Sequence, residues 1–485
     1  MTKINKKNHP EGLYALTFGE FWDRFSYFGT LTILVLYLSK IFNLHVVHAY
    51  LLYGVFVAFS FATPVLGGLL ADKVLGSYNA IIVGAIFMIG GNLVLMNQSL
   101  ELFYLGLSLT ICGTGLYKSS CTSMVGMLYQ KDDARRTQGF TIFYAGMNLG
   151  AVLGPVVYGI ILKLFGWHYI FISSAIGIFI GLLITLHRLR PLQRLLYQPK
   201  IVASFKSLLA KYLFVFSIVA MILVLSTLAI TVFIYPELFT IFIALFSILA
   251  PLAITAVAAK QDYVTKRSLY GVLILTAFCV LFFSVSLQIG STVTMFLQQH
   301  ANRNLFGWHI PTVMFSSLDP LFVVLAAPVF SIIWLRLAIK KLEPSPTKKL
   351  SIGLALGGIS FLVFMLLSTI PNASAVMTVT LIIIANLFLG AGEICLTPAI
   401  LSAISEYVPK NLQATMMGIW FLALALAGYL SGVIAEGAES LQKLLDVSNV
   451  HGFSYLFLLV GCCALALSII IFVASSTVQK LFEVR

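Results

Sequence analysis

Long apolar runs recur along this chain, and they constrain its fold more than any other feature. A helix needs about 20 mostly apolar residues to cross the hydrocarbon core of a bilayer, and runs of that length recur between residues 13 and 478. Charged residues make up only 10% of the chain, against about 25% in soluble globular domains. A soluble protein could not cover this much apolar surface, so we expect lipid to be its solvent.

Fourteen segments are long and apolar enough to span a membrane. In chain order they are 13–40, 48–71, 78–98, 101–128, 138–165, 168–187, 211–233, 237–259, 268–298, 311–339, 350–371, 376–406, 412–436 and 452–478. They group as six, two and six. We therefore predict an all-α membrane protein with three parts: an N-terminal six-helix bundle at 1–190, a cytoplasmic linker with two extra membrane helices at 191–265, and a C-terminal six-helix bundle at 266–485.

Two six-helix bundles joined by a basic connector resemble the major facilitator architecture, in which the halves rock about a site at the membrane midplane. The segment from Gly68 to Gly76 supports this interpretation, because it contains Asp72 and Lys73 between flanking glycines and resembles the loop signature of that superfamily. It falls in the predicted cytoplasmic turn between the second and third helices.

Basic residues predict the orientation, because Lys and Arg concentrate in cytoplasmic loops. With the N-terminus in the cytoplasm, cytoplasmic segments hold 24 of the 30 Lys and Arg residues and outer loops hold four. Both termini are therefore predicted to be cytoplasmic, in a multi-pass protein of the cell (inner) membrane. The net charge of +13 therefore reflects the Lys and Arg residues that fix the orientation of the chain in the membrane. We expect the protein to contact lipid and not nucleic acid.

Cysteine and histidine placement gives no sign of a metal site or of another cofactor. The six cysteines lie in apolar runs without metal-ligand spacing, and the eight histidines fall in loops or at helix ends. The basic N-terminus is not followed by the short apolar core and cleavage site of a signal peptide. We expect no cofactor, with a proton gradient as the driving force, and a functional monomer.

Charged residues inside predicted membrane helices are costly and are therefore candidate functional residues. Glu20, Asp23 and Arg24 share one helix face through their i, i+3 and i+4 spacing, and Glu20 can pair with Arg24. Lys118, deep in the fourth helix, can neutralise the remaining acid. Two interpretations remain open: a structural ion-pair lock, and a titratable network whose pairing changes with substrate or protons.

Two acids lie in the predicted C-terminal bundle. Glu393 follows Gly392 and precedes Pro398, and such residues permit close packing or a kink in a membrane helix. It could line a cavity or form a gating pair. Asp319 precedes Pro320 and could line the cavity or cap its helix.

At these residues the sequence resembles the proton-dependent oligopeptide transporter family, the peptide transporter (POT/PTR) branch of the major facilitators. Residues 20–29 are similar to its E-x-x-E-R-F-x-Y-Y-G motif, and residues 113–118 to the start of G-x-G-x-x-K-P-N. Residues 139–150 are similar to G-F-x-I-F-Y-x-G-I-N-x-G, and residues 392–398 to G-E-x-x-x-S/T-P. The resemblance runs nearly from end to end.

The resemblance implies proton-driven import of di- and tripeptides. It implies that Lys118 meets the peptide carboxylate and Glu393 its amino group. Backbone contacts would come from Tyr27 and Asn148, and Trp420 would shape a side-chain pocket. The implied proton and ion-pair network comprises Glu20, Asp23, Arg24, Lys118, Asp319 and Glu393.

Several positions depart from the family pattern. Asp23 and Phe28 replace Glu and Tyr, and Phe61 stands where the family has a binding Tyr. Leu31 replaces a cavity Arg, and the segment 283–288, with Ser286, replaces one bearing Trp and Glu. Removing both partners of a buried pair can be close to neutral, whereas removing one is costly. This indicates an altered coupling mechanism, in which Asp319 or Glu393 takes over part of the switching.

Alternatives remain open at this level. The chain could be a facilitator, a carrier of another small zwitterion or organic anion, or a sensor that binds peptide without transporting it. An enzyme is disfavoured, because the sequence offers no nucleophile–base or metal constellation.

Overall fold

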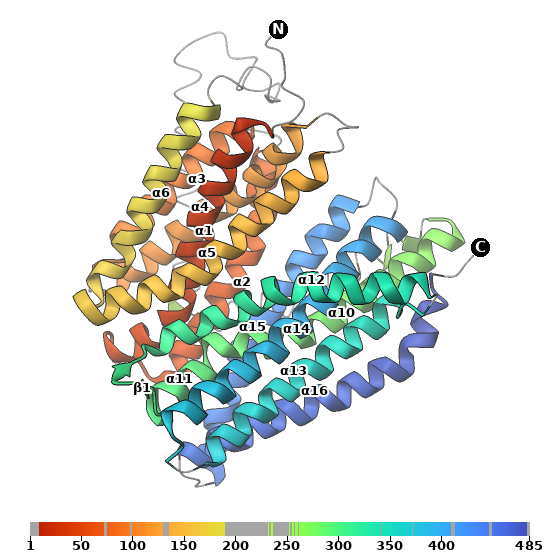
Figure 1. Cartoon of the computed structure of the whole chain (residues 1–485). Coiled ribbons are helices and arrows are strands. Elements are labelled where there is room, and N and C mark those ends of the chain that lie inside the picture. The colour runs from red at the N-terminus through yellow and green to blue at the C-terminus, as the bar shows by residue number, and fades with distance from the viewer. Residues whose placement is uncertain are drawn as a thin grey trace. The chain divides into compact units, whose positions relative to one another are not determined.

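The computed structural model describes residues 9–71, 75–97, 99–129, 135–189, 231, 234–235, 252, 255–256, 258–259, 261–340, 342–370, 372–408, 413–445 and 449–482. These residues form an almost entirely helical protein (Figure 1). The elements are α1 (Glu11–Lys40), α2 (Val46–Leu70), α3 (Ser77–Val94), α4 (Leu100–Met127), α5 (Arg135–Phe165), α6 (His168–Leu189), α10 (Tyr263–Ser286), η3 (Leu287–Gly290), α11 (Thr292–His300), β1 (Asn304–Leu305), β2 (Trp308–His309), η4 (Thr312–Ser317), α12 (Leu318–Ile339), α13 (Pro346–Thr369), α14 (Ala375–Tyr407), α15 (Gln413–Leu445) and α16 (Asn449–Gln479).

Every predicted membrane segment outside 211–259 overlaps one of these helices. The two predicted helices at 211–233 and 237–259 lie largely outside the described residues. Within the described part, 11 helical segments are long and apolar enough to cross a membrane. α1 is not one of them, because Glu20, Asp23 and Arg24 interrupt its apolar sequence. The structure confirms the all-helical membrane class and leaves the count of fourteen as a prediction.

The predicted segment 268–298 is a single span with a break in it. The α-helical geometry of α10 gives way to the 3₁₀ turn η3 at Leu287–Gly290 and resumes in α11. Gln288 stabilises this break, because its side-chain amide donates to the Ser431 carbonyl of α15 at 2.8 Å. Tyr53 of α2 also donates its hydroxyl to the Leu287 carbonyl at 2.8 Å. The Leu287 carbonyl at the break is thus satisfied by a side chain from another helix.

Helix starts follow ordinary capping chemistry. Asp262, Ser345 and Ser374 precede α10, α13 and α14, and each side chain accepts a backbone N–H of the first turn. Such caps satisfy donors that have no partner inside the helix.

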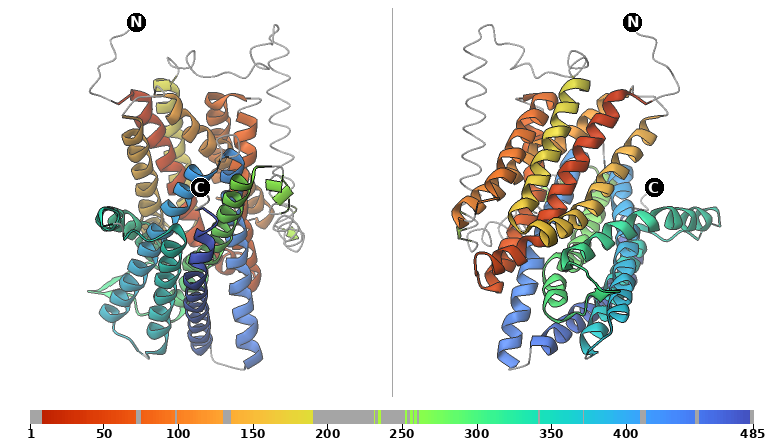
Figure 2. Two further views of the ribbon diagram at one scale, coloured as in Figure 1. Left: turned by 90° about the vertical axis from the view of Figure 1, so that its right-hand side faces the viewer. Right: turned by 60° about the vertical axis from the view of Figure 1, so that its left-hand side comes forward.

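The chain forms two compact units, whose helices can be followed in two further views (Figure 2). Unit 1 comprises residues 1–30 and 59–234, and unit 2 comprises residues 31–58 and 235–485. α1 and α2 therefore each contribute residues to both units. The expected division at residues 190 and 265 stays a prediction, whereas this grouping places residues 31–58 with the C-terminal helices.

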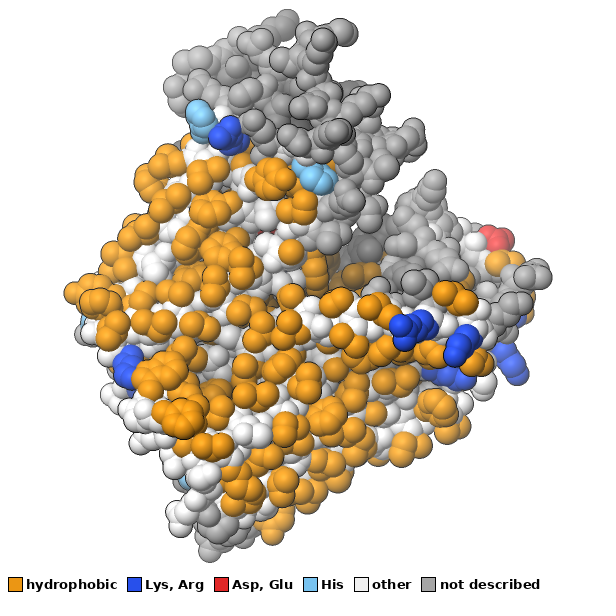
Figure 3. Space-filling model, in the orientation of Figure 1, with side chains coloured by type: hydrophobic (Ala, Val, Ile, Leu, Met, Phe, Trp, Pro, Cys, Tyr) orange, Lys and Arg blue, Asp and Glu red, His pale blue; other side chains and the backbone are white. Residues whose placement is uncertain are grey.

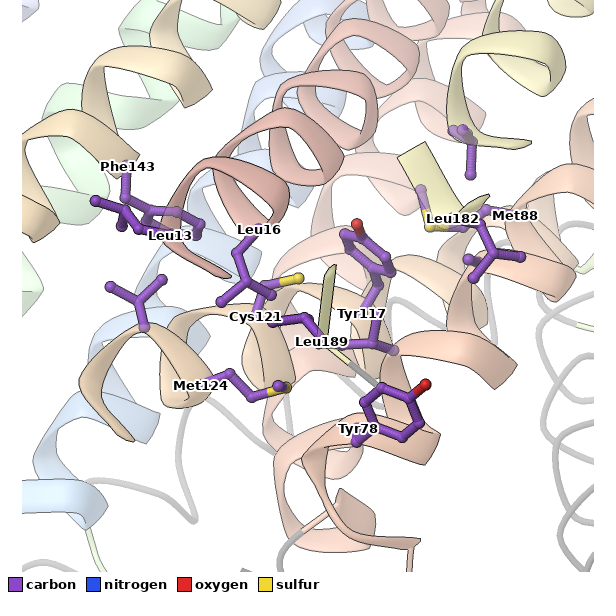
Figure 4. Packing of buried hydrophobic residues seen from close by; sticks show 14 residues of the cluster. Leu13, Leu16, Tyr78, Met88, Tyr117, Cys121, Met124, Phe143, Leu182 and Leu189 are labelled. Atoms are coloured by element: carbon purple, nitrogen blue, oxygen red, sulfur yellow. The ribbon is translucent and has the colours of Figure 1, made fainter. Parts of the chain in front are cut away.

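A cluster of buried hydrophobic side chains holds unit 1 together (Figure 4). Leu13 and Leu16 of α1 lie beside Cys121 and Met124 of α4, and Phe143 of α5 packs at the edge of the cluster. The cluster ties α1, α3, α4, α5 and α6 into one body, and the charged residues of α1 lie one to three turns further along that helix.

In unit 2, α13 packs along both α14 and α16 (Figure 1). Two buried serines join α13 to α16: the Ser351 hydroxyl donates to the Ser468 carbonyl, and the Ser468 hydroxyl to the Ser351 carbonyl, each at 2.9 Å. Small residues that allow helices to approach and hydrogen-bond are typical of membrane bundles.

Hydrophobic side chains dominate the described surface, and Lys and Arg side chains stand near its margins on the face shown in Figure 3. Exposed leucine, isoleucine and valine residues run along α6, α12, α14 and α16. Such a surface is stable in lipid and not in water.

Candidate functional site

The charged face of α1 is buried in unit 1. Glu20 and Asp23 are 0% and 1% exposed, and Arg24 Nε lies 3.5 Å from Glu20 Oε1. The i, i+4 spacing of Glu20 and Arg24 produces this ion pair along one helix face. At 3.5 Å the contact is electrostatic rather than a short hydrogen bond.

Lys118 of α4 joins this face. Its charge interacts with those of Glu20, Asp23 and Arg24, so two acids and two bases form one buried quartet. The quartet is electrically neutral when every member is ionised. The structure therefore brings together the four charged residues that the sequence singled out in the N-terminal half.

Close helix packing places Lys118 beside an aromatic ring. A Cβ on Gly67 of α2 would lie 2.2 Å from the Gly115 carbonyl oxygen of α4, so only glycine fits there. One to two turns away, Lys118 Nζ lies 5.2 Å from the centre of the Phe61 ring. Tyr27 is buried nearby, and its ring meets that of Phe61 edge to face at 6.4 Å.

Thr114 belongs to the site, although the sequence analysis did not predict it as a site residue. This buried threonine of α4 lies within hydrogen-bonding reach of the Asp23 carboxylate. The only available signal was a small polar residue between Gly113 and Gly115 in an apolar helix, which is common in membrane bundles for packing reasons alone.

Asn148 lies on α5, which packs closely on α1. A Cβ on Gly150 would lie 2.2 Å from the Phe21 carbonyl oxygen, so glycine is required where these helices meet. The Asn148 amide donates to the Tyr144 carbonyl at 2.9 Å within its own helix. Its oxygen remains available to accept a hydrogen bond from a ligand.

Two carboxylates approach each other in unit 2. Asp319 is in the first turn of α12, and Glu393 is on α14. A Cβ on Gly390 would lie 3.1 Å from the Asp319 carbonyl oxygen, which shows how closely these helices meet. The charges of Asp319 and Glu393 interact, and Asp319 Oδ1 is buried without a hydrogen-bond partner among the described residues.

The remaining candidates of unit 2 lie near the break in α10–η3–α11. Ser286 is buried at the last residue of α10, and Trp420 of α15 is 4% exposed. The Trp420 ring meets Phe283 edge to face at 6.0 Å. Leu31 is also buried in unit 2. Leu31 and Ser286 are thus uncharged at two positions where the family pattern has charged residues.

Three further predictions concern the signature loop, metal binding and the cysteines. Asp72 and Lys73 of the predicted signature loop lie outside the described residues. In the part of the chain that is described, His, Cys, Asp and Glu residues form no cluster that could hold a metal ion. The six cysteines include four buried and two exposed thiols, all unpaired with one another.

Charged residues buried inside lipid-spanning helices are typical of proteins that move solutes across membranes. The fold and this site therefore define a multi-pass membrane transport protein. The POT family model matches residues 78–450, and the chain belongs to the POT family.

Similar proteins cover nearly the whole chain. "Uncharacterized transporter YclF" of Bacillus subtilis (strain 168) is 31% identical over 453 residues, covering 91% of each chain. The "Di-/tripeptide transporter" of Lactococcus lactis subsp. lactis (strain IL1403) is 27% identical over 507 residues, covering 99% of each. A crystal structure of a POT family transporter in complex with 5-aminolevulinic acid has a TM-score of 0.82 and 27% identity, covering 97% of each chain. The chain thus has the major facilitator fold.

Proposed function

We propose that this protein imports di- and tripeptides as a secondary active transporter, by proton symport with an atypical coupling network. The observation that carries the proposal is the neutral, buried quartet of Glu20, Asp23, Arg24 and Lys118. The similarity to a di-/tripeptide transporter over the full length supports the substrate class.

The quartet explains how a proton can recruit a substrate. Protonating Glu20 or Asp23 changes the quartet from neutral to a net positive charge of one. An unbalanced positive charge in a low-dielectric site attracts an anion. In our proposal Lys118 then binds the peptide carboxylate, while Tyr27 and Asn148 hold the peptide backbone.

In our proposal the carboxylates of unit 2 supply the negative charge that binds the peptide ammonium group. Asp319 and Glu393 repel each other when both are ionised, so the pair retains a proton until a cation replaces it. The peptide ammonium group would bind Glu393 and displace that proton. Trp420 and Ser286 of unit 2 would contact peptide side chains, and Phe61 of unit 1 would position Lys118.

The coupling is atypical because the span α10–η3–α11, which bears Ser286, contributes no acid. Ser286 and Gln288 are neutral, and Leu31 is buried and apolar. We propose that Asp319 and Glu393 carry this part of the switching. Uptake of labelled di-alanine into proteoliposomes tests the proposal, with and without an inward proton gradient.

We expect the gradient to drive accumulation of di-alanine, and Asp319→Asn to reduce accumulation while leaving exchange intact. Unchanged coupling in Asp319→Asn would exclude the role of Asp319. Equilibration without accumulation in the wild type would favour a facilitator, and binding without uptake would favour a sensor.

A second candidate is a carrier of another small zwitterion. The neutral residues at positions 31 and 286 favour it, because carboxylate binding then rests mainly on Lys118. A similar transporter has been crystallised with 5-aminolevulinic acid. Competition of di-alanine uptake by 5-aminolevulinic acid and by free alanine discriminates between the two.

We further propose a functional monomer in the cell (inner) membrane with cytoplasmic termini, no cofactor and no enzymatic activity. The distribution of 24 cytoplasmic against four outer basic residues supports this orientation. Labelling of single cysteines near each terminus with a membrane-impermeant reagent tests it.

A further inference from the structure

A short β-hairpin joins α11 to α12. Its strands β1 and β2 pair antiparallel, with Asn304 opposite His309 and Leu305 opposite Trp308. The two residues between the strands both have positive φ, 50° at Phe306 and 79° at Gly307. This is the backbone of a type I′ turn, whose twist matches that of the strands.

Phe306 is an unusual residue for the first position of such a turn. Asn, Asp and Gly are preferred there, because a bulky side chain in the left-handed region is sterically disfavoured. The Phe306 side chain is 93% exposed, so it gains almost no packing within the protein in return. Backbone strain of this kind is concentrated at functional positions.

The base of the hairpin is held firmly. Arg303 is 6% exposed, and its Nη1 donates to the Ile310 carbonyl at 3.0 Å. The Ile310 N–H donates back to the Arg303 carbonyl at 3.0 Å. Thr312 Oγ1 also donates to Gln298 Oε1 at 2.7 Å across the base. The tip is therefore presented in a fixed direction.

The hairpin lies between the ends of two candidate membrane spans. The span before it ends at His300, and the span after it begins at Thr312. β1 contacts α14, whose exposed apolar surface begins at Val376 and Met377.

We propose that Phe306 and Trp308 dock into the lipid headgroup layer at the membrane face where α11 ends. The indole of Trp308 favours this layer because its apolar rings contact acyl chains while its N–H contacts water. The Phe306 ring is apolar, and its burial at the boundary between headgroups and acyl chains removes it from water. Charge complementarity supports lipid as the occupant. Lys40 is exposed, lies within electrostatic range of Arg303 and forms no ion pair with a described residue, so it can attract headgroup phosphates.

This anchor is separate from the transport site. Nitroxide labels at Phe306→Cys and, as the matched control, Asn302→Cys test it in the full-length protein. Both variants also carry Cys462→Ala and Cys463→Ala, which remove the exposed thiols. Asn302 is exposed near the base of the same hairpin. The protein is placed in vesicles of phosphatidylethanolamine and phosphatidylglycerol.

Accessibility of each label to oxygen, which concentrates in lipid, is compared with accessibility to a water-soluble nickel chelate. We expect the oxygen-to-nickel ratio at position 306 to exceed that at position 302 by at least ~3-fold, because the tip enters the interface. Equal ratios would overturn the proposal by placing the tip in water. Exclusion of both reagents at position 306 would overturn it in favour of a protein partner or a second copy.

A second measurement leaves Phe306 unchanged. The emission of Trp308, obtained as the difference between wild type and Trp308→Phe, should be quenched by brominated lipid and shielded from iodide. Trp308 that iodide quenches and brominated lipid does not would overturn the proposal even if the Phe306→Cys variant fails to fold.

Discussion

Lys118 Nζ lies 5.2 Å from the centre of the Phe61 ring, so the central cation of unit 1 faces an aromatic surface. A ring in this position attracts a cation without neutralising it. The ring therefore helps to hold the Lys118 side chain in place, and the charge of Lys118 interacts with Asp23 and Glu20.

Phe61→Ala should raise the KM for di-alanine uptake by roughly 2- to 30-fold, because a cation–π contact contributes about 0.5–2 kcal/mol. Phe61→Tyr keeps the ring and should stay near the wild-type KM. Phe61→Leu is the matched control for volume, and a wild-type KM in that variant would show that the ring does not position Lys118.

Glu20→Ala should lower the free energy of unfolding by up to about 3 kcal/mol, because it removes the ion-pair partner of Arg24, whose side chain is 13% exposed. The double variant Glu20→Ala/Arg24→Leu should recover much of this loss, since both charges are removed together. Thermal unfolding in detergent measures both variants. A double variant less stable than Glu20→Ala would contradict the pairing.

Helix positions were predictable because lipid imposes a simple length and polarity rule on each span. The break at Leu287–Gly290 was not predictable in the same way. It depends on the hydrogen bond from Gln288 to Ser431, 143 residues away, and on that from Tyr53 to Leu287, 234 residues away. Hydropathy carries no information about such distant contacts.

Gln288→Glu should make stability depend on pH. The wild-type amide donates to the Ser431 carbonyl at 2.8 Å. A protonated Glu can donate to this carbonyl, whereas an ionised one places two acceptors against each other. The variant should therefore be most stable in acid and lose stability as the pH rises. Gln288→Ala is the control, and an equal loss at every pH in both variants would contradict this account.

Asp262 caps α10 from outside the membrane. Hydrogen bonds from the Thr265 side chain and backbone N–H lower the pKa of Asp262 below its usual value. A lowered pKa means that the cap stabilises the fold above the ordinary pKa of Asp and that this contribution is lost as the pH falls through the lowered value. The difference in thermal stability between wild type and Asp262→Asn should therefore shrink in acid. A difference that is constant across pH would show that the charge of Asp262 contributes nothing.

The four charges of unit 1 could be identified from sequence because the bilayer makes any charge in a span conspicuous. Thr114 could not, because a threonine is unremarkable in a membrane helix. The approach of Asp319 to Glu393 was also hidden, since it depends on the packing of α12 against α14 at Gly390. The sequence therefore identifies charged residues inside a span, whereas the contacts between them depend on helix packing that the sequence does not reveal.

The charges on α1 also affect how the protein is made. Each charge at the centre of a span costs about 2.5–3.5 kcal/mol on insertion into lipid, and α1 carries three of them. Lys118, which neutralises this face, is synthesised 94 residues after Arg24. α1 therefore reaches its lowest free energy only after α4 has entered the membrane. Assembly of the quartet is in this sense a step of membrane integration as well as of transport.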